Sequence, residues 1–310
     1  PRSRGLGDVY KRQEQYKTLQ HSDYDQLAPE LKEVVDRRID AQDNPDATRQ
    51  ALRDNAGTDW SRQAIEGAIF RDALEYLARG EKPPYVSLWD YNTPRIQNFR
   101  KKVELGGYEA LWAEAERVGL VGHAEKPVNS VNSSFLNCEP SKNCAKFCYA
   151  TKGFYIQTNN ILKGELTDWV VQNDPARAAK IIARNYSGMA EFYTGKALRI
   201  FDKGDSNNQW AKFVEEINKV SIDGNRIRIH VFSKHPDFLR KVSDFNLRLL
   251  SIDETNLQLA IDNPDLGIAY VYTGTDADIA FLEQQEERFK KHGGVTVSYT
   301  HLTLPTNREV

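Results

Sequence analysis

The feature that most constrains the fold is an alternation of short β-type runs with helical segments after about residue 122. The β-type runs are 128–135, 197–201, 226–232, 247–253 and 267–274. Helices are expected at 158–172 and 175–189, the second capped by Asp174, and around Trp210. Strands that alternate with helices pair in parallel, because each helix carries the chain back across the sheet. The sequence therefore predicts an α/β fold with a complete or partial (β/α) barrel-like parallel sheet.

The first third of the chain has only helical patterns and predicts an all-helical domain over residues 14–122, before an α/β domain at 123–295. Expected helices cover 29–41, 45–52, 60–79 and 94–118. Asp59 is expected to cap the third helix and Gly80 to end it, while Gly106 and Gly107 break the fourth. We expect no polar constellation to assemble here, so composition indicates an accessory role, with a protein as the expected partner.

Polar residues follow the β-type runs at the points where the strands should end. Because these loops gather at one face of such folds, their side chains are expected to meet there. We take Asp202, Asp205, Ser233 and His235 as candidate residues for binding a small-molecule ligand. The full set is Asp202, Lys203, Asp205, Ser233, Lys234, His235, Asp253, Glu254, Thr255, Thr273 and Thr275.

All three cysteines of the chain, Cys138, Cys144 and Cys148, lie in one short loop with the spacing C-x5-C-x3-C. Such spacing lets a loop turn its sulfurs toward one ion or cluster, and these cysteines are the candidate metal ligands. Structural zinc needs four ligands, so it would require a histidine or an outside group. A [4Fe–4S] cluster held by three cysteines keeps one iron open for a small molecule, as in the radical S-adenosylmethionine enzymes. Unligated thiols are the third alternative.

The longer string CEPSKNCAKFCYATKGFY (138–155) resembles the hallmark of an uncharacterised, mainly phage-encoded family known as gene product 88. The strings LRIFDKGD (198–205) and IRIHVFSKHP (227–236) are similar to its Gly-Asp strand and the strand that follows, so the resemblance covers roughly 128–271. Glu139 departs from the pattern, which usually has proline there. The resemblance implies the cysteine site but no particular reaction. Residues matching the hallmark are Cys138, Cys144, Cys148, Tyr149, Ala150, Gly153 and Tyr155.

Several other residues have both a functional and a structural interpretation. Gly204 and Asp205 either position a ligand or form a turn in which Asp205 or Ser206 caps the next helix. His235 is a fourth metal ligand, a proton carrier or an exposed residue at a helix start. His230 is expected to pack within its strand. Three arginines in or beside the strands either bind a carboxylate or phosphate or form surface ion pairs; they are Arg199, Arg226 and Arg228. Three aromatic residues are expected to cover the cysteine loop; they are Tyr149, Phe154 and Tyr155.

The two ends of the chain are expected to be foreign to it. A DNA string that encodes DVYKRQ (8–13) has a reverse complement that encodes TVSYTH (296–301) in another frame. Residues 1–13 and 296–310 therefore resemble one sequencing adapter translated in its two orientations, and we leave them out of fold reasoning. On this interpretation the remainder is a fragment of a metagenomic gene.

Charge and composition exclude several classes of protein. The two ends carry five basic and two acidic residues, so the remainder has 37 basic and 42 acidic residues and a net charge of −5. That balance is against a broad nucleic-acid surface, and no apolar run has the ~18–20 residues of a membrane helix. Few cysteines and no secretion signal favour the reducing cytoplasm of a bacterial or phage-infected cell. The P-loop, G-x-G-x-x-G, G-x-S-x-G and H-E-x-x-H motifs are absent from the sequence.

Overall fold

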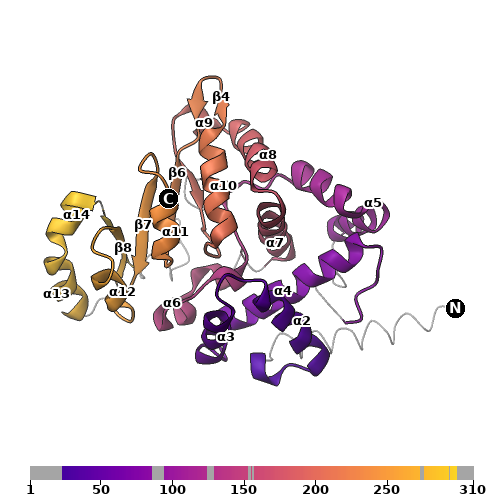
Figure 1. Cartoon of the computed structure of the whole chain (residues 1–310), viewed down its shortest axis with the longest axis horizontal. Coiled ribbons are helices and arrows are strands. Elements are labelled where there is room, and N and C mark those ends of the chain that lie inside the picture. Colours follow the sequence, from indigo (N-terminus) through magenta and orange to yellow (C-terminus); the bar gives the residue numbers. More distant parts are fainter. Residues whose placement is uncertain are drawn as a thin grey trace, which may run out of the picture.

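A computed structural model describes residues 23–85, 94–123, 129–152, 155, 157–272, 276–292 and 294–298. It has the predicted α/β character, with helices placed before a mainly parallel sheet (Figure 1). No helix among these residues has the length and apolar character needed to cross a bilayer. Phe154, Thr273 and Thr275, which the sequence singled out, lie outside the described residues.

The main sheet has the order β1-β2-β3-β6-β7-β8-β9. β1 pairs antiparallel with β2, and within the main sheet every pairing from β2 to β9 is parallel. Neighbouring strands of this sheet follow one another in the chain, apart from a separate hairpin between β3 and β6. This succession is typical of (β/α) barrels, whereas the order found among the described strands is open, with β1 and β9 at its edges. The strands are β1 Gly122–His123, β2 Asn129–Val131, β3 Leu198–Ile200, β6 Ile229–Ser233, β7 Leu247–Ile252, β8 Gly267–Tyr272 and β9 Gly294–Ser298. β9 thus includes residues 296–298 of the segment attributed to an adapter.

One predicted strand is displaced. The run 226–232 was expected to be continuous, but Asn225–Arg226 (β5) pairs with Ser221–Ile222 (β4) in a separate hairpin. Asp223 and Gly224 at its turn have φ angles of 52° and 79°, the left-handed conformation that a two-residue hairpin turn requires. Asp-Gly is a strong signal for such a turn, and it moves the start of the sheet strand to Ile229.

The helices agree closely with the sequence pattern, but the cap of α4 differs. Asn44 and Asp174 cap α3 and α8, Gly80 has a φ of 75° just after α4, and Gly107 interrupts α5 with a φ of 62°. Thr58, not Asp59, caps α4, because its hydroxyl accepts from the Ser61 N–H. The helices are α2 Pro29–Asp40, α3 Pro45–Asp54, α4 Asp59–Ala78, α5 Pro94–Val118, α6 Lys142–Phe147, α7 Thr158–Asn173, α8 Pro175–Ser187, α9 Ala190–Tyr193, α10 Asn208–Lys219, α11 Pro236–Lys241, α12 Leu257–Ile261, α13 Asp276–Gln284 and α14 Glu286–His292, with short 3-10 turns η1 Tyr24–Gln26, η3 Phe135–Asn137 and η4 Tyr149–Thr151.

Alternation along β3 and β6 gives the sheet two different faces. Ile200, Ile229 and Val231 are buried in the main core with residues of α7, α8 and α10, including Trp210. Figure 1 shows these three helices together beside the sheet. The intervening residues of β3 and β6 lie on the opposite face and are only half-buried.

The long helix α4 joins the helical segment to the α/β segment through shared cores. Its second half, with Phe70 and Leu74, packs in the main core with the strands. Its first half, with Ile65, packs in a second core with α2, α3 and the residues that flank the cysteines, such as Phe135 and Leu136. Residues on both sides of position 122 are therefore packed in each core.

A shared core predicts that damage to α4 destabilises the sheet as well. Phe70→Ala removes a fully buried ring and is expected to lower the free energy of unfolding by about 3–5 kcal/mol. Leu105→Ala is the control, because Leu105 is 80% exposed and its loss should cost well under 1 kcal/mol. Urea unfolding followed by circular dichroism and by tryptophan fluorescence should give coincident transitions. Two separated transitions, with only one shifted by Phe70→Ala, would contradict a shared core.

Candidate functional site

The loops that follow β2, β3 and β6 meet at the carboxyl edge of the sheet around the side chain of Asp205. One Asp205 oxygen accepts from Ser206 N–H at 2.7 Å and from Ser233 Oγ at 2.5 Å, and the other accepts from Lys234 N–H at 3.1 Å. The Ser133 hydroxyl, in the loop after β2, donates to the Asp205 carbonyl at 2.6 Å. Asp205 is 7% exposed, so its contacts form in a region of low dielectric constant.

Of the structural alternative for Gly204 and Asp205, the turn at Gly204 is present, but neither Asp205 nor Ser206 caps the next helix. Asn207 caps α10, because its side-chain oxygen accepts from the N–H groups of Gln209 and Trp210. This leaves the Asp205 carboxylate available to join the ends of β3 and β6.

Gly204 allows the loops after β2 and β3 to lie against each other. Its φ is 83°, and a β-carbon there would overlap Ser133 Oγ and lie 2.7 Å from the carbonyl oxygens of Ser133 and Ser134. Lys203 N–H also donates to Asn132 Oδ1 at 2.8 Å, and Ser133 N–H donates to the Lys203 carbonyl at 3.1 Å. Only glycine combines this backbone conformation with so close an approach.

The cysteine loop begins directly after β2 and is fixed to the loop after β7. Ser141 caps α6 by accepting from Cys144 N–H at 3.2 Å, and the same hydroxyl donates to the buried carboxylate of Asp253. Asn143 donates to Glu254 at 3.0 Å. Cys144 lies within α6 and Cys148 at its end, so these contacts place both thiols over the carboxyl edge.

The three thiols are half-buried and form no disulfide, and their electrostatic environment is shared. Burial, and then the charges of Asp205, Cys144 and Cys148, raise the pKa of the Cys138 thiol well above its usual value. Burial and Cys144 raise the pKa of the Cys148 thiol to about 12. Among the described residues, no three Cys, His, Asp or Glu side chains are placed so as to hold one metal ion.

Lys234 is a positive group at this edge, and the sequence analysis did not select it as a ligand-binding residue. Burial lowers its pKa, but Cys144, Asp205, Asp253 and Cys138 together hold the pKa above the usual lysine value. Its ammonium group donates to Ser251 Oγ at 3.5 Å. The strand pattern placed Lys234 at a strand end, but the pattern carries no signal for the acidic groups and thiols that surround its amine.

Behind Cys138 lies a buried polar network centred on Asp168, which the sequence analysis also missed. Asp168 accepts from Asn137 Nδ2 at 2.8 Å and from Trp210 Nε1 at 2.9 Å, and it lies 3.5 Å from Arg71 Nη1. Asn137 directly precedes Cys138, and its carbonyl oxygen lies 3.3 Å from His235 Nε2. The network therefore connects α4, α7 and α10 to the residue before the first cysteine.

His235 lies inside the carboxyl edge, because its Nε2 is also 3.9 Å from Asp205 Oδ2. Its backbone N–H donates to Ser233 Oγ at 3.1 Å. The structure thus brings Asp205, Ser233 and His235 together, while the role of His235 as ligand or proton carrier stays a prediction.

Asp202 lies in a separate cluster with the tyrosines that follow the cysteines. Tyr149 donates to Asp202 Oδ1 at 3.1 Å, Tyr155 donates to Oδ2, and Arg199 Nη1 lies 3.2 Å from Oδ1. The tyrosines are therefore anchored by hydrogen bonds as well as packed on the second core. Arg199 is not a surface pair, since its side chain is 20% exposed and its partner is buried.

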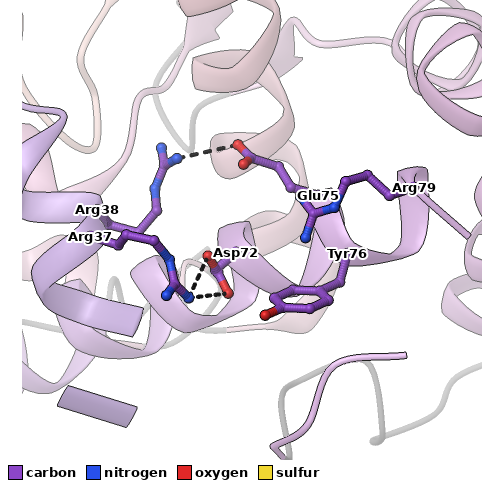
Figure 2. Close-up of a pocket in the computed structure, with 6 residues that line it drawn as sticks. All are labelled: Arg37, Arg38, Asp72, Glu75, Tyr76 and Arg79. Atoms are coloured by element: carbon purple, nitrogen blue, oxygen red, sulfur yellow. Dashed lines mark hydrogen bonds and ion pairs between the residues drawn. The ribbon is translucent and has the colours of Figure 1, made fainter. Parts of the chain in front are cut away.

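The helical segment holds a polar cavity that the sequence analysis did not expect. It has a volume of about 330 Å³ and is drawn in Figure 2. Arg37 lies 3.4 Å from Asp72, and Arg38 lies 3.2 Å from Glu75, so these charges are paired across α2 and α4. The residues that line the cavity are Arg37, Arg38, Asp72, Glu75, Tyr76 and Arg79.

Comparisons with protein-family models, with curated proteins and with solved structures gave no match to this chain.

The contact at Gly204 predicts a large difference between two glycine substitutions. Gly224→Ala, in the hairpin turn with a φ of 79° and no atom near its β-carbon, should cost about 1–2 kcal/mol of stability from backbone strain. Gly204→Ala adds the overlap with Ser133 and Ser134, so its cost should reach about 3–5 kcal/mol. Chemical denaturation of both variants measures this difference. Equal costs would mean that the two loops are not in contact.

His230 predicts a loss of stability at low pH. Burial, with the charges of Arg199 and Arg228, lowers the pKa of His230 to about 4. As the pH falls, the His230 imidazole is protonated near pH 6.5 in the unfolded chain and only near pH 4 in the folded chain. The free energy of unfolding therefore decreases between these two pH values. Relative to His230→Phe, the wild type should lose about 1–2 kcal/mol between pH 7 and 4.5 in chloride buffer, after discounting for partial exposure. A pH-independent difference between the two proteins would contradict this assignment.

Proposed function

We propose that this chain binds an iron–sulfur cluster through Cys138, Cys144 and Cys148. The observation that carries the proposal is the position of the three thiols. They lie in the loop after the first parallel strand, and the charges of Cys144 and Lys234 act on the thiols of both Cys138 and Cys148. Cysteine thiolates are the ligands that hold iron–sulfur clusters, and three free thiols lie here in one partly buried environment.

One feature of the electrostatics favours metal-bound thiolates at this site. Lys234 supplies a positive charge beside thiols that must lose their protons on binding.

A cluster with three cysteine ligands would supply electron transfer and an open iron at which a small molecule can bind. The enzymatic form of this proposal is a radical enzyme, and in such an enzyme the open iron would bind S-adenosylmethionine. Membership of the phage gene product 88 family belongs to the same proposal, because it depends on the same cysteines.

The neighbouring residues divide into two roles under this proposal. Asp205, Ser233 and His235 lie at the carboxyl edge and would orient the bound small molecule. Asp202 would act indirectly, since its carboxylate holds Tyr149 and Tyr155 after the last cysteine. The ligand-binding role of Asp202 stays a prediction, and its contacts with the two tyrosines add a positioning role.

Anaerobic reconstitution with iron and sulfide tests the proposal. The wild type should acquire about four irons and four sulfides with a broad absorption near 400 nm. Single serine substitutions at the three cysteines should each lower the iron content by at least about half. Lys142→Ala is the matched control, because Lys142 lies in α6 with an exposed side chain, and it should retain full iron content.

Stoichiometric zinc with no cluster after reconstitution, or iron content unaffected by all three serine substitutions, would refute the proposal. The zinc outcome would indicate a metal that stabilises the fold of an accessory protein.

A further inference from the structure

The face of the sheet opposite α7, α8 and α10 carries a row of nitrogen-bearing side chains. Between Ile227 and Ser233 buried and more exposed residues alternate, which places Arg228, His230 and Phe232 on this face. Arg199 of β3 is the register partner of His230, so their side chains leave neighbouring strands on the same side.

Three of these side chains form one contact group. The Arg199 guanidinium carbon lies 5.2 Å from the centre of the Phe232 ring, and the Phe232 ring lies 4.6 Å from that of His230, at an angle of 82°. Phe232 therefore fixes both the guanidinium and the imidazole against the sheet.

Two buried nitrogens of this group have no hydrogen-bond partner among the described residues. Asp202 and Tyr149 engage the terminal nitrogens of Arg199, at 3.2 and 3.4 Å, whereas Arg199 Nε has no acceptor. His230 Nε2 is likewise buried and unpartnered. Buried donors without acceptors destabilise a protein, so such a pair on adjacent strands is suited to an acceptor that a bound ligand supplies.

The charge of the group favours an anion. Asp202 offsets the charge of Arg199, and Arg228 adds a second positive charge whose field, with that of Arg199, acts on His230. A neutral imidazole can present an N–H at Nε2 in one of its tautomers, and the guanidinium always presents one at Nε. Oxyanions are the acceptors that match such paired N–H donors.

We propose that Arg199 Nε and His230 Nε2 form a binding site for an oxyanion, the carboxylate or phosphate group of a small molecule. Phe232 forms one wall of this site, and Tyr149 connects it to the cysteine loop. The site uses none of the cysteines, so it stands whether or not a cluster binds.

Nuclear magnetic resonance of the histidine side chains tests the site directly. In chloride buffer at constant ionic strength, inorganic phosphate and acetate are titrated separately into the whole protein. The His230 Nε2 resonance, assigned by its loss in His230→Phe, should shift and saturate with one or both anions. Saturation by phosphate alone indicates a phosphate group, and saturation by acetate alone indicates a carboxylate. Binding at ten times the dissociation constant should also raise the melting temperature by roughly 2–4 °C.

Substitutions test which side chains bind the anion. Arg199→Met and His230→Phe should each abolish the thermal shift, and the charge-matched control Arg184→Met should keep it, because that side chain is 75% exposed on α8. Absence of any anion-dependent shift of His230 in the wild type would overturn the proposal, as would a thermal shift in His230→Phe equal to that of the wild type. Neither result depends on whether Arg199→Met folds.

Discussion

The carboxylate of Asp205 is the constraint on which the carboxyl edge of this sheet depends. A buried carboxylate persists only when its lone pairs are satisfied, and here the donors come from the loops after both β3 and β6. The adjacent Gly204 brings the loop after β2 against the same point, so three strand ends share one polar centre. The cysteine loop begins from that centre, which limits where its thiols can lie.

The loop is then held from two further directions. Asp168 and Arg71 fix the residue before Cys138 from the helical side, and Asp253 fixes the start of α6 from the loop after β7. The helical segment therefore has a structural part in the site, since α4 supplies Arg71 and packs beneath the cysteines. A loop held at both of these points can keep its thiols in place without a disulfide, which the proposed cluster requires.

Local features of this fold follow from sequence patterns, and contacts between distant residues do not. Periodicity and caps such as Asp174 predict the helices, and the β–α alternation predicts a parallel sheet whose strand ends carry the polar residues. The partners of those residues lie dozens of positions away, as Ser133 does from Asp205, and no local pattern specifies them. The surface-pair alternative for Arg199 fails for a different reason: its partner Asp202 is only three residues away, but the sequence does not reveal that this ion pair is largely buried.

Iron K-edge X-ray absorption of the reconstituted protein tests the central claim most directly. A cluster bound by the three cysteines predicts a first shell of sulfur and a second shell of iron around each iron atom, both lost when all three cysteines are replaced by serine. A first shell of oxygen and nitrogen alone, or a spectrum unchanged by the triple substitution, would contradict the assignment of Cys138, Cys144 and Cys148 as cluster ligands.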